Sequence, residues 1–309
     1  MLTVIGEALV DVVSKHGQEP RAHAGGSPMN VAVGLARLGH EVQFLGRYGG
    51  DEYGAQVEAH LRDNGVLLPF EPDDRPTSVA EAVIGHDGAA TYDFQLDWSL
   101  ELTGTQLEAL LRDTGLLHVG SIGAMLEPGA SKVVQAVERA HPSALVSYDP
   151  NCRPSIIPDS SDARARAEQL VALADVVKAS DEDLLWLYPN RGVGESAGAW
   201  LKLGAELVVV TRGPMGPWAR TRATGPRGVE VPAARATVVD TVGAGDSFMA
   251  AMLAWLTDQG CTGARARERV GGLDPEQVRD LLAYAARAAG VTVSRAGADL
   301  PRRDEMPAS

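Results

Sequence analysis

Short apolar runs alternate with helical patterns along almost the whole chain of 309 residues, and this alternation restricts the possible folds more than any other feature. The spacing predicts strands at residues 2–5, 42–45, 116–120, 145–149, 176–179 and 207–211. It predicts helices at residues 28–38, 52–62, 130–139, 247–256 and 276–289. Because parallel strands need such helical crossovers, we expect one α/β domain over residues 1–309, with a mostly parallel central sheet flanked by helices on both faces.

One part of the chain departs from this alternation. Two extended runs within residues 77–98 are joined by Asp87-Gly88, which is a strong hairpin signal. Residues 11–24 also look extended rather than helical. We predict that these two segments form a small β-sheet that projects from the main sheet and covers a site. A hairpin at the edge of the main sheet is the alternative.

The charge and the cysteine count exclude several classes of protein. The formal net charge is −13, which disfavours nucleic acid or an anionic membrane surface as the main partner. The two cysteines, Cys152 and Cys261, cannot form a disulfide framework, and their surroundings lack the spacing of a zinc site. The first residues do not resemble a signal peptide, and no apolar run approaches the roughly 18 to 20 residues of a membrane span. We therefore expect a cytoplasmic protein.

The most informative segment, residues 238–248, runs from a short apolar strand through a glycine-rich turn into a helix. Small residues at Gly243, Ala244 and Gly245 leave backbone N–H groups uncovered at the helix N-terminus, where anions bind. Asp246 places a carboxylate beside that anion site. An enzyme that moves a phosphoryl group onto a hydroxyl needs both features. The alternative is a glycine-shaped turn followed by an ordinary early-turn acid.

A second segment precedes the first predicted helix. Gly25 and Gly26 allow a ligand to approach the backbone, and Asn30 offers both a donor and an acceptor to a sugar hydroxyl. Ser27 is placed as the N-cap of the helix and Pro28 in its first turn. Taken alone, this segment is equally typical of a simple helix cap.

Together with the glycine-rich residues 46–54, these segments resemble the signatures of the ribokinase-like (PfkB) carbohydrate kinases, in the same order and separation. The resemblance extends over the whole chain. It implies the ribokinase fold, an ATP-dependent sugar kinase, and a small sheet that acts as a lid and in this family often joins two subunits into a homodimer. It also implies that Asp246 is the catalytic base and that the backbone of Gly243, Ala244 and Gly245 forms an anion hole.

The resemblance assigns further residues to the site. Sugar hydroxyls would be held by Asp11, Gly25, Gly26 and Asn30. Asn151 and Arg153, which follow the strand at 145–149, are candidates for contact with nucleotide or substrate. The turn past the nucleotide would contain Thr211, Gly213 and Gly216. Mg²⁺ would accompany ATP, and K⁺ would lie near Asp240.

The chain departs from the family at residues 180–183. The family often carries Asn-x-x-Glu near the metal and the phosphates, whereas this sequence reads Ser180-Asp181-Glu182-Asp183. We carry the metal role to Asp183, with Glu182 as a competitor. An acidic helix start capped by Ser180 is the structural alternative, and it is compatible with a metal role.

Residues 6–11 and 149–154 look most like those of fructokinases, which predicts transfer of the γ-phosphate of ATP to fructose, giving fructose 6-phosphate. The 2-keto-3-deoxygluconate kinases are the close rival. A substrate carboxylate would favour an arginine on the flap, but residues 91–96 contain no basic residue. This favours a neutral sugar, with Tyr92 or Phe94 packed against its face.

Two functions of other classes are alternatives. Gly194-Glu195-Ser196-Ala197-Gly198 matches the Gly-x-Ser-x-Gly motif of serine esterases, but the residues before it do not form a core strand and no histidine follows Ser196. A non-catalytic sugar-binding protein of the same fold is the other alternative. It would not require a carboxylate at Asp246.

Overall fold

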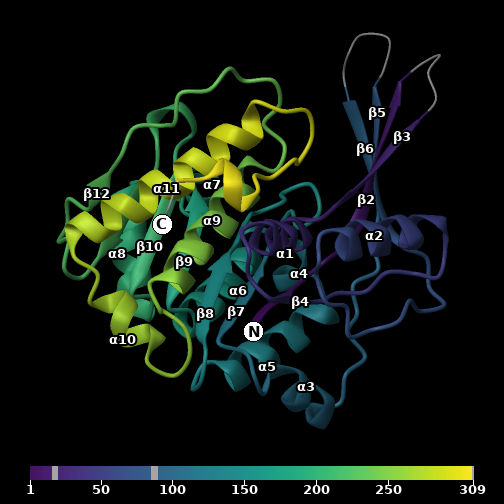
Figure 1. Ribbon diagram of the computed structural model, residues 1–309, viewed down its shortest axis with the longest axis horizontal. Helices are drawn as coiled ribbons and strands as arrows, with labels where there is room; N and C mark the ends of the chain where they lie inside the picture. The colour runs from purple at the N-terminus through teal and green to yellow at the C-terminus, as the bar shows by residue number, and fades with distance from the viewer. Residues whose placement is uncertain (16–19, 85–89, 308–309) are drawn as a thin grey trace.

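The computed structural model describes residues 1–15, 20–84 and 90–307, and the predicted turn at Asp87-Gly88 lies outside them. Within the described residues the central sheet has eight strands (Figure 1). In spatial order they are β12 (Val229–Glu230), β11 (Trp218–Thr221), β10 (Leu207–Thr211), β9 (Val176–Ser180), β8 (Leu145–Asp149), β7 (Leu116–Gly120), β1 (Leu2–Ile5) and β4 (Val42–Leu45). All pairs from β4 to β10 are parallel, and β11 and β12 are antiparallel. This confirms the predicted fold class.

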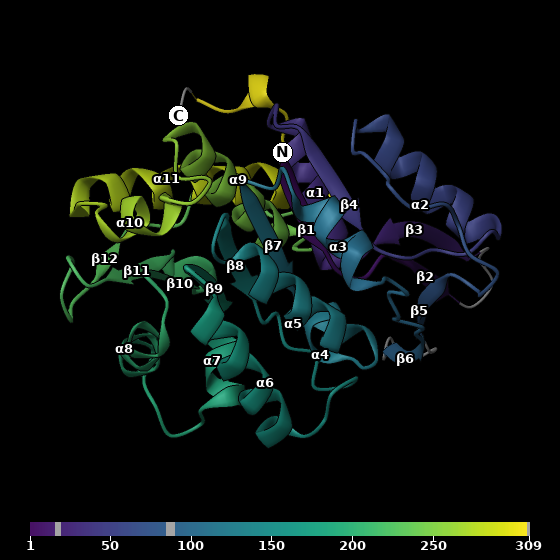
Figure 2. The same cartoon turned by 90° about the horizontal axis from the view of Figure 1, so that it is seen from below.

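Helices cover both faces of the sheet, as Figure 2 shows. One face carries α1 (Ser27–Arg37), α9 (Ala244–Asp258), α10 (Ala266–Gly271) and α11 (Pro275–Val293). The other carries α3 (Gly104–Leu111), α4 (Ser121–Met125), α5 (Gly129–Ala140), α6 (Ser160–Leu173), α7 (Asp181–Leu187) and α8 (Val193–Leu203). Short 3₁₀ turns lie at Gly213–Met215 and Arg303–Glu305. None of the helices in the described part of the chain is long and apolar enough to cross a membrane.

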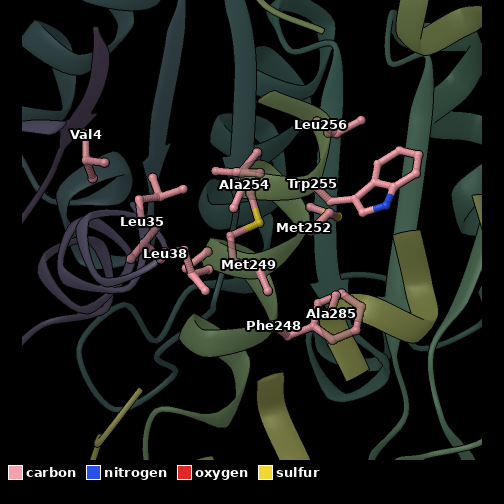
Figure 3. Packing of buried hydrophobic residues seen from close by; sticks show 14 of the residues in the cluster. Val4, Leu35, Leu38, Phe248, Met249, Met252, Ala254, Trp255, Leu256 and Ala285 are labelled. Atoms are coloured by element: carbon pink, nitrogen blue, oxygen red, sulfur yellow. The ribbon is translucent and has the colours of Figure 1, made fainter. Parts of the chain in front are cut away.

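The packing of α1 against α9 fixes the position of the site. Leu35 of α1 and its C-cap residue Leu38 lie in the same buried cluster as Met249 of α9 (Figure 3). Burial of each such side chain stabilises the fold by about 1.5–3 kcal/mol. Gly34 lets the two helices approach closely, because a Cβ at this position would lie 2.6 Å from the Cβ of Ala250. The first turns of α1 and α9 are therefore held beside each other.

The second sheet is separate from the first and stands beside it in Figure 1. Its strands, in spatial order, are β3 (Arg21–Gly25), β2 (Leu9–Lys15), β5 (Ser78–Ile84) and β6 (Ala90–Gln95). Next to it lies α2 (Glu52–Asp63). The predicted small sheet is confirmed, and the alternative of a hairpin at the edge of the main sheet is wrong. Its role as a lid stays a prediction.

Two predicted helix starts are wrong. The helix expected from residue 247 begins at Ala244, because Gly243 adopts φ 75° and turns the chain directly into the helix. Ser27 is not an N-cap either. Gly26, with φ 114°, takes that position, and Ser27 is the first helical residue. Its hydroxyl donates instead to a carboxylate of α9, at Asp246.

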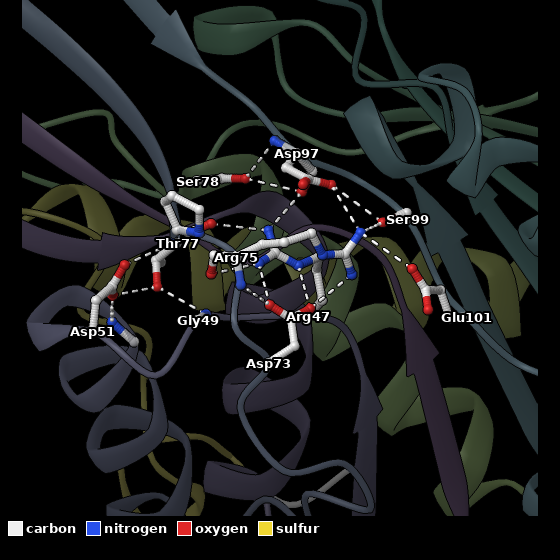
Figure 4. Close-up of polar contacts among 12 residues, drawn as sticks. Arg47, Gly49, Asp51, Asp73, Arg75, Thr77, Ser78, Asp97, Ser99 and Glu101 are labelled. Carbon is white, nitrogen blue, oxygen red and sulfur yellow. Dashed lines mark hydrogen bonds and ion pairs between the residues drawn. The ribbon is translucent and has the colours of Figure 1, made fainter.

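Arg47 holds both ends of the β5–β6 hairpin (Figure 4). Its guanidinium donates to the Asp73 carboxylate at 2.6 and 2.9 Å, and to the carbonyl oxygens of Arg75, Pro76 and Asp97. These hydrogen bonds hold the pKa of Asp73 far below its usual range. The carbonyls precede β5 and follow β6, so one buried side chain fixes the base of the small sheet.

We expect Arg47→Ala to lower the free energy of unfolding by about 2 kcal/mol, because it leaves buried acceptors without a donor. Urea unfolding followed by circular dichroism measures this. Arg62→Ala is the matched control, because Arg62 is 52% exposed and pairs with Glu58 within one helix. Equal unfolding midpoints for the two variants would contradict the role of Arg47.

Candidate active site

A cavity of about 1420 Å³ lies where the strands of the main sheet end at their carboxyl termini and the small sheet begins. Carboxyl ends of parallel strands are the usual place for ligands in α/β folds. Glu7 follows β1, while Ser121 and Asn151 follow β7 and β8. The first turns of α1 and α9 complete the wall, and Phe94 faces it from the small sheet.

Asp246 lies in the first turn of α9 and lines this cavity. Its Oδ1 accepts a hydrogen bond from the hydroxyl of Ser27 at 2.6 Å, and its Oδ2 accepts one from the amide of Asn30 at 2.8 Å. Both donors belong to the first turn of α1. The side chain is therefore fixed in one orientation at the cavity wall, with its carboxylate available to accept a proton from a bound hydroxyl.

The glycines before Asp246 also lie at the cavity, as an anion hole requires. Gly243 is the N-cap in the left-handed region, and it and Gly245 line the cavity. Amides at this point of a helix have no intrahelical acceptor and carry the positive end of the helix dipole. Ala244 differs from the prediction, because its N–H donates to the carbonyl of Thr241 at 3.3 Å and the residue is not among those lining the cavity.

An ion pair between Lys178 of β9 and Asp149 of β8 lies close to this turn, and neither residue was singled out from the sequence. The Lys178 Nζ is 2.7 Å from the Asp149 Oδ2, and the two side chains are 5% and 2% exposed. Burial raises the pKa of Asp149 to about 6, although Lys178 opposes this shift. The available signal was a lysine between the apolar residues Val177 and Ala179 of a predicted core strand.

Glu7 is the other missed residue. It is 4% exposed, lines the cavity, and accepts a hydrogen bond from the Gly123 amide at 2.7 Å. Burial raises its pKa to about 7. Beside it, Ser121 and Asn151 have φ values of 54° and 35°. Non-glycine residues rarely adopt such values, and they gather at functional sites.

The raised pKa of Glu7 predicts a pH dependence of stability. Unfolded Glu7 loses its proton near pH 4.5, whereas folded Glu7 keeps it to about pH 7. The contribution of Glu7 to the free energy of unfolding is therefore fully present below pH 4.5 and is lost as the pH rises to 7. The total loss is about 3 kcal/mol. Glu7→Gln should gain stability relative to the wild type over this range. Urea unfolding between pH 5 and 7.5 measures it, with the exposed Glu138→Gln as control. Parallel stability curves for wild type and Glu7→Gln would contradict the assignment.

The structure brings most of the predicted site residues to one cavity. Its lining includes the predicted sugar-binding residues Asp11, Gly25, Gly26, Asn30, Phe94 and Arg153, together with Asn151 and Asp240. Three predicted nucleotide contacts, Thr211, Gly213 and Gly216, lie at the end of β10 and are not among the lining residues.

The predicted metal ligands Glu182 and Asp183 also lie outside the cavity lining. Asp183 forms a capping box with Ser180, and its other oxygen accepts the Cys152 amide at 2.7 Å. Both of its carboxylate oxygens are thus engaged by protein donors. Among the described residues no group of three acidic, histidine or cysteine side chains is arranged to hold a metal ion. The segment is thus an acidic helix start capped by Ser180, which was the structural alternative. The metal role of Asp183 stays a prediction, and these hydrogen bonds weaken it.

The esterase motif is not an active site. Ser196 lies inside α8 and its side chain is fully buried, whereas an esterase nucleophile stands exposed on a turn after a strand. His118, a histidine upstream of the motif, pairs with Ser147 at 3.0 Å within the main sheet.

Comparison with known proteins decides the family. The model described as pfkB family carbohydrate kinase matches residues 1–305. The chain belongs to this family. The chain is 34% identical to a fructokinase from Rhizobium leguminosarum bv. trifolii over 287 residues. The matched region covers 91% of this chain and 86% of the relative. The pfkB kinase is therefore a phosphotransferase, as predicted.

Solved structures agree with this assignment. A fructokinase with bound ATP from Xylella fastidiosa has a TM-score of 0.84 and 30% identity to the pfkB kinase, covering 99% of this chain and 94% of that one. A fructokinase double mutant from Vibrio cholerae O395, in a form with fructose, ADP and potassium ion bound, has a TM-score of 0.74 and 27% identity. Its match covers 96% of this chain and 93% of that one.

Proposed function

We propose that this pfkB kinase transfers the γ-phosphate of ATP to the primary hydroxyl of fructose, giving fructose 6-phosphate. Fructokinases at 30–34% identity over most of the chain support the substrate. The observation that carries the chemistry is the position of Asp246, whose carboxylate lies at the cavity wall directly after the glycine-rich turn of α9.

Asp246 acts as the general base in this proposal. The hydrogen bonds from Ser27 and Asn30 hold its carboxylate toward the bound sugar, so it accepts the hydroxyl proton as the oxygen attacks the γ-phosphate. Backbone N–H groups at Gly243 and Gly245 stabilise the charge on the phosphoryl oxygens. Both groups are held in place, because α9 is buried from Asp246 to Leu256 and packs against α1 and α11.

The sugar lies against the first turn of α1. Asp11 stands over Gly25, where any Cβ would overlap its carboxylate, so Gly25 leaves room for this acceptor of sugar hydroxyls. Gly26 permits a close backbone approach in the same way, since a Cβ there would lie 2.6 Å from the carbonyl oxygen of Glu7. Asn30 donates to Asp246, which leaves its carbonyl oxygen as the group that accepts from the sugar. Phe94 packs on the sugar face.

The small sheet acts as a lid in this proposal, over about residues 11–24 and 77–98. Closure excludes water, which otherwise competes with the sugar for the phosphoryl group. Arg47 follows β4 of the main sheet and fixes the base of the hairpin, so the movement takes place in the strands beyond that base. Pairing of two subunits through this sheet stays a prediction.

Two ions belong to the proposal. Mg²⁺ neutralises charge on the phosphates of ATP, and we expect those phosphates and water to supply most of its ligands, as is usual for this ion. K⁺ near Asp240 is favoured by the potassium-bound relative. Asp240 fits that role better than Asp183 because it lines the cavity, although the Val242 and Gly297 amides also donate to its two oxygens. These hydrogen bonds keep the pKa of Asp240 below the usual value, so its carboxylate is charged.

A sugar acid is the second candidate substrate, and one observation favours it. Arg21 and His23 of β3 line the cavity, so the small sheet presents basic side chains that the strand at residues 91–96 lacks. Together with Arg153 they offer partners for a carboxylate. The argument for a neutral sugar from residues 91–96 alone is therefore incomplete.

ADP release over a panel of fructose, ribose, 2-keto-3-deoxygluconate, tagatose phosphate and adenosine tests the proposal. We expect the highest kcat/KM with fructose. A higher value with 2-keto-3-deoxygluconate would replace fructose by the sugar acid. Sugar binding without ADP release from any member would contradict the kinase reaction and favour the non-catalytic alternative.

A further inference from the structure

Lys178 is a buried cation to which the proposed reaction assigns no role. It stands in β9 between Val177 and Ala179, which are fully buried and face the helices α5, α6 and α8. The side chain of Lys178 points to the opposite face, as does that of Val176, which packs in the cluster of α1 and α9. The lysine therefore lies beneath α9.

Its ammonium group is directly behind the proposed anion hole. A Cβ placed on Gly245 would lie 3.4 Å from the Lys178 Nζ, and Gly245 lines the cavity whereas Lys178 is not among the lining residues. Nearby His118 stays neutral, because burial and the charge of Lys178 lower its pKa to about 3. The Asp149 carboxylate raises the pKa of Lys178 against the effect of burial, so Lys178 contributes a positive charge at this point.

Such an arrangement is unfavourable for the fold alone. A buried ion pair can often be replaced by apolar residues without loss of stability, since removing two charges from water is costly. A cation behind a helix N-terminus is also repelled by the positive end of the helix dipole. Both effects become favourable once an anion lies in front of Gly245, because the ammonium and the amides then attract the same charge.

The partner of Lys178 connects it to the other wall of the cavity. Asp149 ends β8, and its Oδ1 accepts a hydrogen bond from the Asn151 amide at 3.2 Å. Asn151 has the unusual φ of 35° and carries the chain toward Arg153, which lines the cavity. The ion pair therefore joins the turn after β8 to the first turn of α9.

We propose that Lys178 is a positioning residue for phosphoryl transfer: its charge strengthens the anion hole through Gly245, and its pair with Asp149 holds the turn that carries Asn151 and Arg153. Lys178 neither gives nor takes a proton, and it acts from behind the backbone rather than by touching the sugar. The inference rests on the proposed kinase reaction, but not on which sugar is the substrate.

The decisive comparison is made in the Asp149→Asn background, where no ion pair is left to break. We compare the single variants Asp149→Asn and Lys178→Met with the double variant, using the sugar that gives the highest turnover. Lys202→Met, at an exposed lysine of α8, is the matched control. A purely structural lysine predicts that Lys178→Met is neutral or stabilising in this background.

We expect the double variant to turn over at least about tenfold more slowly than Asp149→Asn, with the sugar KM within about threefold and no loss in unfolding midpoint. Calorimetry should show ATP binding about fivefold more weakly for the same pair of variants. Equal kcat in Asp149→Asn and the double variant would overturn the proposal. If the wild-type protein turns over no sugar, the proposed function fails, but the role of Lys178 can still be tested by ATP binding. Equal ATP Kd values for Asp149→Asn and the double variant would then overturn that role.

Discussion

Asp246→Asn should lower kcat by about 10²–10⁴-fold while fructose still binds. The substitution removes the group that accepts the hydroxyl proton but keeps the size of the side chain. One oxygen remains to accept from Ser27 or Asn30, and the new amide faces the other donor. The loss therefore appears mainly in kcat rather than in the sugar KM, and steady-state ADP release measures both.

The control for this variant is Asp280→Asn, because Asp280 is an exposed acid of α11. It should leave kcat and KM unchanged. Circular dichroism must show that Asp246→Asn is folded, since the altered hydrogen bonds lie between α1 and α9. A folded Asp246→Asn enzyme with wild-type kcat would rule out Asp246 as the base.

Gly243→Ala should lower kcat by about 10²-fold, the scale of losing one donor of an oxyanion hole. A Cβ at Gly243 would lie 2.6 Å from the Cβ of Ala298 and 2.9 Å from its Cα, so the first turn of α9 must move. That movement displaces the amides at Gly243 and Gly245 together with the carboxylate of Asp246. The φ of 75° adds a stability cost of about 1–2 kcal/mol for any side chain.

Gly263→Ala separates these two effects. Gly263 has φ 74°, almost the same backbone conformation, but no atom lies within 4 Å of the position of its Cβ. Gly263→Ala should therefore lose about the same 1–2 kcal/mol from its backbone conformation and keep the wild-type kcat. Turnover assays and urea unfolding on both variants measure the difference. Equal kcat in Gly243→Ala and Gly263→Ala would show that the turn at Gly243 does not position the reacting groups.

Local patterns were enough to predict the layers of the fold. Alternating strands and helices predicted the parallel sheet, and extended segments outside that alternation predicted the second sheet. The position of Gly243 to Asp246 at a helix start could also be predicted, because a glycine-rich turn before a helix is local in sequence. Its role as an anion site stays a prediction. The exact start of α9 could not be predicted, since it depends on the backbone conformation that Gly243 adopts against Ala298.

Contacts between distant segments could not be read in this way. Ser27 was expected to cap its own helix, yet its hydroxyl donates to Asp246, 219 positions away in the chain. Lys178 and Asp149 become neighbours only because β8 and β9 are adjacent in the parallel sheet. Strand order and register decide such pairs, and neither is encoded in a short pattern.

The attachment of Asp246 to α1 has a consequence for retargeting the enzyme to other sugars. In the proposed reaction the helix whose first turn faces the sugar also holds the base, so we expect substitutions at Ser27 or Asn30 to alter recognition and turnover together. Side chains of the small sheet, such as Ala82 and Phe94, reach the same cavity from a separate layer. Libraries for directed evolution should therefore diversify these strands first, because new specificities can arise there while the chemical step stays intact.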